Sequence, residues 1–105
     1  MTHPLTRRRL LELSDMMRRF DRPVLVKFGG GLEAERLGFV TQEDLSYLGL
    51  GEGKVAVYFP HSFAWSGNLL IVPKQNVTAL EARPADVMKF AVSGGVSQVD
   101  EEEAP

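Results

Sequence analysis

The sequence predicts an α+β fold, with a small mixed, mainly antiparallel sheet of 4-5 strands, an N-terminal amphipathic helix and a short C-terminal helix. Three patterns indicate this class. Apolar residues recur at helical spacing near the N-terminus, short apolar runs broken by glycine and proline fill the middle, and a proline-led apolar segment ends at Ser93-Gly94-Gly95. A small partly closed β-barrel with flanking helices is the alternative architecture.

The N-terminal helix is predicted over residues 5–20. Leu10, Leu13, Met17 and Phe20 recur at three- and four-residue steps, which places them on one stripe of a helix. Charged residues fall on the opposite face, so the helix is expected to be amphipathic.

Alternating and continuous apolar runs predict the strands. The runs at 54–59 and 69–72 are almost wholly apolar, which is typical of strands covered on both faces, so we expect these two in the middle of the sheet. The predicted strands cover residues 24–28, 36–41, 54–59 and 69–72, with 77–80 extending a ragged edge.

The C-terminal helix is predicted over residues 84–92. Pro84 suits the first helical position, and Gly94 suits the left-handed conformation that ends a helix.

The chain length limits the domain organisation. Its 105 residues suit one domain with a single modest core. We expect residues 1–96 to form that globular domain, with the sheet and the short helix over 23–96. Residues 97–105 are rich in acids and poor in apolar side chains, so they are expected to form a disordered acidic tail.

Composition excludes several classes of protein. The chain has no cysteine, which excludes disulfides, thiolate zinc sites and a cysteine nucleophile. It has no apolar run of about 18 residues, so we expect no transmembrane segment in this chain. A cytoplasmic location, peripheral to a membrane, is the expectation.

Charge is distributed unevenly. Residues 1–22 carry six arginines against three acids, whereas the remainder carries eleven acids against six bases. The cluster Arg7-Arg8-Arg9 is a candidate contact for an anionic membrane. No second basic patch accompanies it, so nucleic acid is not an expected partner.

No cofactor or metal is predicted. The Gly29-Gly30-Gly31 loop lacks the Lys-Ser/Thr pair of a phosphate-binding loop. His3 and His61 are the only histidines, and the acidic pairs lack the periodicity of a calcium loop.

The loop between the third and fourth predicted strands carries the candidate interaction surface. His61, Phe63 and Trp65 lie there, and large apolar side chains in a loop either fold back over the core or face a partner. Self-association or a protein partner is expected.

The less favoured alternative is a small hydrolase. It would use His61 as the base and a nearby serine as the nucleophile. No G-x-S-x-G motif surrounds a serine. The candidate nucleophiles are Ser62, Ser66 and Ser93, and the candidate orienting acids are Asp86 and Asp44.

Several short motifs together resemble a known family, the domain-of-unknown-function family 502. The motifs are GFVT at 38–41, Pro60 followed by Ser66-Gly67, Val72-Pro73, and SGGV at 93–96, and the resemblance covers about residues 20–96. The residues that carry this structural signature are Gly38, Pro60, Ser66, Gly67, Pro73, Ser93, Gly94 and Gly95.

The resemblance implies a soluble domain that in typical members follows two membrane-spanning helices, in a family for which no catalytic residue or cofactor is established. Plant members are called LIKE COV or CONTINUOUS VASCULAR RING and are associated with membranes of the secretory pathway. This chain departs from the pattern because it lacks the spanning helices. It also has His61 to Trp65 where many members have a Thr- and Pro-rich loop. The expected function is a non-enzymatic interaction or assembly module at or near a membrane surface.

Overall fold

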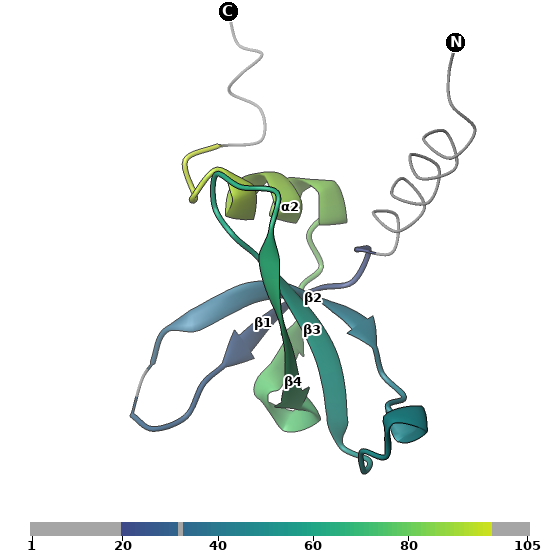
Figure 1. Ribbon diagram of the computed structural model, residues 1–105. Helices are drawn as coiled ribbons and strands as arrows, with labels where there is room; N and C mark the ends of the chain where they lie inside the picture. Colours follow the sequence, from purple (N-terminus) through teal and green to yellow (C-terminus); the bar gives the residue numbers. More distant parts are fainter. Residues whose placement is uncertain (1–19, 32, 98–105) are drawn as a thin grey trace, which may run out of the picture.

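A five-stranded antiparallel sheet with one α-helix across its end forms the protein in the computed structural model, which describes residues 20–31 and 33–97 (Figure 1). The strand order is β4-β3-β2-β1-β5. The elements are β1 (Pro23–Lys27), β2 (Glu35–Gln42), η1 (Ser46–Leu48), β3 (Lys54–Pro60), β4 (Gly67–Pro73), η2 (Lys74–Asn76), β5 (Val77–Ala79) and α2 (Pro84–Val92).

The predicted fold class is wrong in its sheet. Every strand pair in the described part of the chain is antiparallel, so the sheet is not mixed. The physical reason is that β1 to β4 follow one another as hairpins, without the long crossover that a parallel pair needs. The alternative of a partly closed barrel is also wrong, because β4 and β5 do not pair and the sheet is open.

Of the two predicted helices, only the C-terminal one lies within the described residues. The range 5–20 lies outside the described residues except for Phe20, which is not helical, so α2 is the single α-helix among the described residues. The prediction of a helix over 84–92 is confirmed residue for residue. No helix in the described ranges has the length and apolar character needed to cross a membrane.

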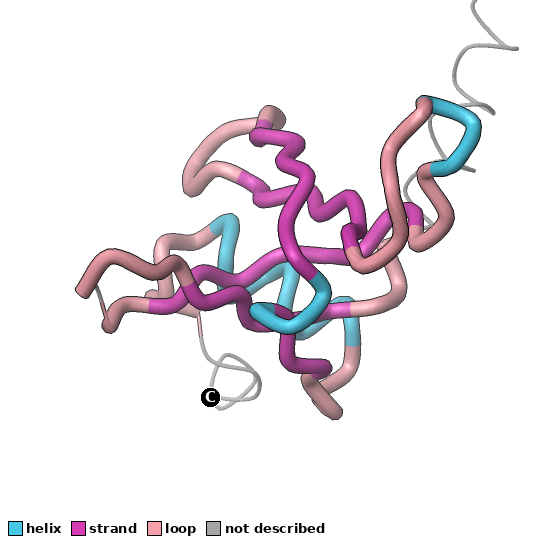
Figure 2. Tube along the Cα trace, turned by 90° about the horizontal axis from the view of Figure 1, so that it is seen from below, coloured by secondary structure: helices cyan, strands magenta, loops and turns pink. Residues whose placement is uncertain are grey.

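The sheet is strongly curled. Only η2 separates β4 from β5, although these strands lie at opposite edges of the sheet. Four residues span at most about 14 Å, whereas the outer strands of a flat five-stranded sheet lie about 19 Å apart. A register shift between Val40 and Gln42 adds a bulge at Thr41, which increases the local twist. Figure 2 shows strands that run in clearly different directions.

The core fills the concave face of this curled sheet. Six valines and Phe59 form one buried cluster, and Phe59 is fully buried. The Arg36 guanidinium lies 5.3 Å from the Phe59 ring centroid, so a cation–π contact covers one end of the core. The buried cluster consists of Val24, Val26, Val40, Val55, Val57, Phe59 and Val72.

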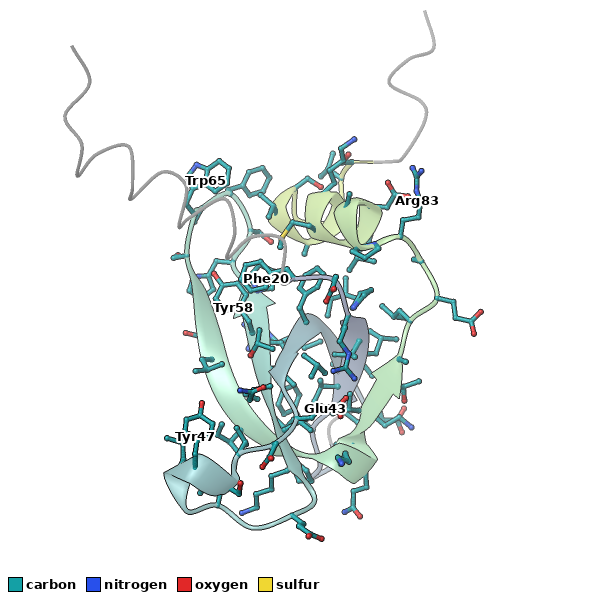
Figure 3. The ribbon with its side chains drawn as sticks, turned by 90° about the vertical axis from the view of Figure 1, so that its right-hand side faces the viewer. Phe20, Glu43, Tyr47, Tyr58, Trp65 and Arg83 are labelled. Carbon is teal, nitrogen blue, oxygen red and sulfur yellow. The ribbon has the colours of Figure 1, made fainter. Side chains whose placement is uncertain are left out.

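An aromatic cluster covers part of the opposite face. Phe20 stacks on Tyr58 with ring centroids 4.9 Å apart, and it also contacts the fully buried Phe39 at 5.9 Å. Figure 3 shows Phe20 directly beside Tyr58. The residue that leads from the undescribed N-terminal segment into the sheet is therefore fixed by packing.

An ion pair between Arg22 and Glu43 joins the start of β1 to the loop after β2. The hydrogen bond and the positive charge of Arg22 hold the pKa of Glu43 below its ordinary value of 4.5. The stabilisation is therefore fully present at neutral pH and is lost as the pH falls through the lowered pKa.

Candidate interaction groove

The β3–β4 loop is closed by a cross-strand pair. The His61 N–H donates to the Ser66 carbonyl at 2.8 Å, and the His61 Nδ1 lies 2.9 Å from the Ser66 Oγ. Pro60 and Gly67, the next residues outward, are already paired across β3 and β4. The loop therefore begins and ends on one ordered pair of residues.

The same loop is anchored to the end of α2. The last carbonyls of a helix have no partner within the helix, and here the Ser62 hydroxyl donates to the Ala91 carbonyl at 2.8 Å. The Phe63 N–H donates to the Val92 carbonyl at 2.6 Å. Phe63 has a φ of 57°, in the left-handed region, and these contacts hold it there.

The end of α2 has the hydrogen bonds of a Schellman motif. The Gly94 N–H donates to the Ala91 carbonyl and the Gly95 N–H to the Phe90 carbonyl. The Ser93 hydroxyl also donates to the Phe90 carbonyl. The role predicted for Ser93-Gly94-Gly95 as a helix stop is confirmed.

Gly94 is required for conformation and for space, so we expect Gly94→Ala to destabilise the domain. Its φ is +69°, and an added Cβ would lie 3.1 Å from the Phe63 Cε2. The free energy of unfolding, measured by chemical denaturation, should fall by more than about 1 kcal/mol. Gly49→Ala is the matched control, because Gly49 has a φ of +81° and nothing within 4 Å of an added Cβ. Equal losses for both variants would mean that the Phe63 contact contributes nothing.

A groove of about 990 Å³ lies between the β3–β4 loop, the start of β1 and α2. Its walls are mostly apolar, and four polar residues, Asp21, Lys89, Ser93 and Ser97, also line it. Trp65 is 94% exposed and Phe63 79% exposed. The apolar lining residues are Phe20, Phe63, Ala64, Trp65, Pro84, Ala85, Met88 and Val92.

The three residues of the predicted interaction surface do not lie together. Phe63 and Trp65 line the groove, whereas His61 lines a separate cavity of about 410 Å³ with Arg36 and Phe90. Two of the three residues therefore line one groove, and the third lies outside it.

The α2 side of the groove was not predicted from the sequence. Pro84, Met88 and Val92 form an apolar stripe on this helix at spacings of four residues, and this stripe faces the groove. That spacing within the predicted helix is the signal in the sequence that indicates it.

The residues required for a hydrolase are in contact only in part. His61 reaches Ser66, but no carboxylate in the described ranges bonds to His61. Asp86 pairs with Arg83 at 3.1 Å, and the Asp44 carboxylate accepts the Ser46 N–H at 3.0 Å, which lowers the pKa of Asp44. The hydroxyls of Ser62 and Ser93 donate to helix carbonyls. The arrangement is that of loop and helix-end anchoring.

The remaining candidates for ligand binding are dispersed. His3 and Arg7-Arg8-Arg9 lie outside the described residues. Within residues 20–31 and 33–97, no group of three His, Asp or Glu side chains is placed to hold a metal ion.

A protein-family model matches the chain. The family described as "Protein of unknown function (DUF502)" matches residues 9–67, which is more than half of the chain. The match includes Gly38, Pro60 and Ser66-Gly67, but it does not extend to Val72-Pro73 or to residues 93–96. No curated protein and no solved structure matches the chain.

Proposed function

The chain belongs to the DUF502 family, whose description assigns no activity, and we propose from the geometry of the groove that the protein is an interaction module that docks on an anionic membrane surface. The observation that carries the proposal is the position of Trp65, 94% exposed at the rim of a mostly apolar groove. Tryptophan suits the boundary between headgroups and acyl chains because its ring is apolar and its N–H is polar.

The energetics favour burial of the loop. Moving a large apolar side chain out of water contributes about 1.5–3 kcal/mol, and both Phe63 and Trp65 are available. The backbone of Phe63 is already held on Val92, so little conformational entropy is lost when the loop docks.

Charge around the groove supports an anionic surface in particular. Lys89 lines the groove, and Phe20, which also lines it, is joined directly to residues 1–19. That segment carries five arginines against Glu12 and Asp15. Each basic residue near an anionic bilayer contributes about 1 kcal/mol.

The acidic tail opposes this attraction. Ser97 lines the groove and leads to four acids at residues 100–103. Membrane binding should therefore strengthen when these acids are replaced by Asn and Gln, and it should weaken in high salt because exposed charges are screened.

Trp65 provides the test because it is the only tryptophan in the chain. Adding vesicles of phosphatidylcholine and phosphatidylserine should shift its emission to shorter wavelength, and the protein should sediment with the vesicles. Trp65→Ser should weaken the affinity for the vesicles, measured by sedimentation, at least about tenfold. Replacing Arg7, Arg8 and Arg9 by Gln should weaken it by roughly 100-fold.

Tyr47→Ser is the matched control for the loss of an exposed aromatic, since Tyr47 is 71% exposed and lies at the opposite end of the molecule from Trp65 (Figure 3). It should bind like the unmodified protein. An unchanged emission spectrum at saturating vesicle concentration would refute the proposal. So would an emission shift that rises with protein concentration in the absence of vesicles, because a second copy would then cover the groove.

A further inference from the structure

The outer edge of β4 is an unpaired strand edge. β4 has seven residues and pairs only with β3, whereas the strand at the opposite edge, β5, has three. Within the described part of the chain no segment pairs with the outer side of β4. The prediction that this strand lies in the middle of the sheet is wrong, because β4 is at the edge.

The hydrogen bonds beyond each end of β4 show which backbone groups face outward. His61 N–H bonds to Ser66, and Lys74 N–H bonds to Gly53. Hydrogen-bonded and non-hydrogen-bonded pairs alternate in an antiparallel ladder, so the pairs at Asn68, Leu70 and Val72 are the hydrogen-bonded ones. The N–H and C=O groups of Leu69 and Ile71 consequently point away from β3.

The positions of two prolines agree with this alternation. Pro60 pairs with Gly67 and Pro73 with Lys54, and both pairs fall at non-hydrogen-bonded positions of the ladder. Neither proline therefore removes a donor that the β3–β4 ladder would use.

The side chains do not protect the edge. Leu69 is 64% exposed and Ile71 41% exposed, and β4, with the sequence GNLLIVP, contains no charged residue. Exposed edge strands usually carry lysine, proline, a bulge or a covering segment that prevents pairing. In the described structure β4 carries only one of these, Pro73 at its last position, and the outward groups of Leu69 and Ile71 are left unprotected.

We propose that β4 pairs antiparallel with β4 of a second copy of the chain, with Leu70 on the two-fold axis. This register overlaps the whole strand, from Gly67 opposite Pro73 to Pro73 opposite Gly67. It places Leu69 opposite Ile71 of the second copy, so the outward N–H and C=O groups of both residues meet partners.

The second copy is the occupant that the edge fits best because the strand is self-complementary. No like charges meet across the axis, since β4 is uncharged and Lys74 falls opposite Ser66 of the second copy. Leu69 and Ile71 of both copies then lie on one face of a continuous sheet and shield one another from water. The contact is isologous, so it closes at a dimer.

The surface differs from the groove, so the proposal does not depend on membrane docking. Leu69, Leu70 and Ile71 are absent from the groove lining. Edge pairing buries a small area compared with a standard interface, so the dimer should dissociate on dilution.

Sedimentation equilibrium tests the pairing. The mass should rise with concentration from that of an 11.6 kDa monomer toward twice that value. Leu69→Lys should raise the dissociation constant at least tenfold, and Ile71→Pro should do the same by removing an outward donor that β3 does not use. Thr78→Lys, which adds the same charge to the edge strand β5, is the matched control and should leave the dimer intact.

The register is tested separately by cross-linking, because the natural chain contains no cysteine. Leu70→Cys should form a disulfide-linked dimer in air, since residues on the axis face each other within disulfide distance. Asn68→Cys should not, because its counterpart lies about 13 Å away along the strand. A monomer at every concentration, open-ended assembly beyond the dimer, or equal cross-linking of the two cysteine variants would overturn the proposal.

Discussion

Replacing Gly38 by alanine is expected to lower the melting temperature of the domain by roughly 10–20 °C. Gly38 pairs with Val24 in the middle of the sheet and faces the buried core. An added Cβ would lie 2.7 Å from the Val57 Cγ1 and 2.9 Å from the Phe59 Cδ1. Val57 and Phe59 are fully buried, so neither can move without displacing the rest of the core.

The control for this prediction is Gly51→Ala. Nothing lies within 4 Å of a Cβ added at Gly51, and its φ is not in the left-handed region, so the melting temperature should be unchanged. Gly38→Val should prevent folding, so that no cooperative unfolding transition is seen. The loss in the free energy of unfolding would approach the whole stability of a small domain, about 5 kcal/mol. Thermal denaturation followed by circular dichroism measures both. Equal melting temperatures for the Gly38→Ala and Gly51→Ala proteins would show that the core has room for a methyl group at position 38.

The positions of the strands could be predicted from the sequence because they depend on local patterns. Val24 and Val26 alternate with the less buried Leu25 and Lys27, and Val55 to Phe59 is a continuous apolar run; both segments are strands in the structure. Pro84 and Gly94 bracket the helix as their backbone preferences require.

The strand order could not be predicted in the same way. β3 and β4 have equally apolar sequences, yet β3 is central and β4 is an edge strand with Leu69 and Ile71 exposed. An apolar run cannot distinguish a strand covered by its own chain from one available to another chain. The step from β4 to β5 across the curled sheet is a tertiary effect with no local signal.

The candidate site was predicted in part for the same reason. Phe63 and Trp65 lie two residues apart in one loop, so their proximity could be predicted from the sequence. Phe20 and Met88 reach the same groove from the start of the sheet and from α2, and only the fold brings them there. Gly38 and Gly67, two of the signature glycines, are explained by the side chains packed against them, which only the fold shows.

Gly67 is the second position where an added methyl group should have a large effect. A Cβ at Gly67 would overlap the Tyr58 ring and lie 2.5 Å from the Phe59 carbonyl oxygen. The ring could move, but the carbonyl belongs to the β3 backbone and cannot move without disturbing the ladder. We expect Gly67→Ala to cost about 2–3 kcal/mol in the free energy of unfolding.

The effect should extend to the groove, because Tyr58 stacks on Phe20 and Phe20 lines the groove. In the Tyr58→Ala background, Gly67→Ala should cost at least about 0.5 kcal/mol less, since the clash with the ring is gone. The clash with the Phe59 carbonyl remains, so the rescue should be partial. Urea denaturation of the two single variants and the double variant measures this coupling. Asn68→Ala, at an exposed neighbouring position of β4, should be nearly neutral. Strictly additive losses at positions 58 and 67 would contradict the contact between Tyr58 and Gly67, through which the glycine at the start of β4 supports Phe20 and one wall of the groove.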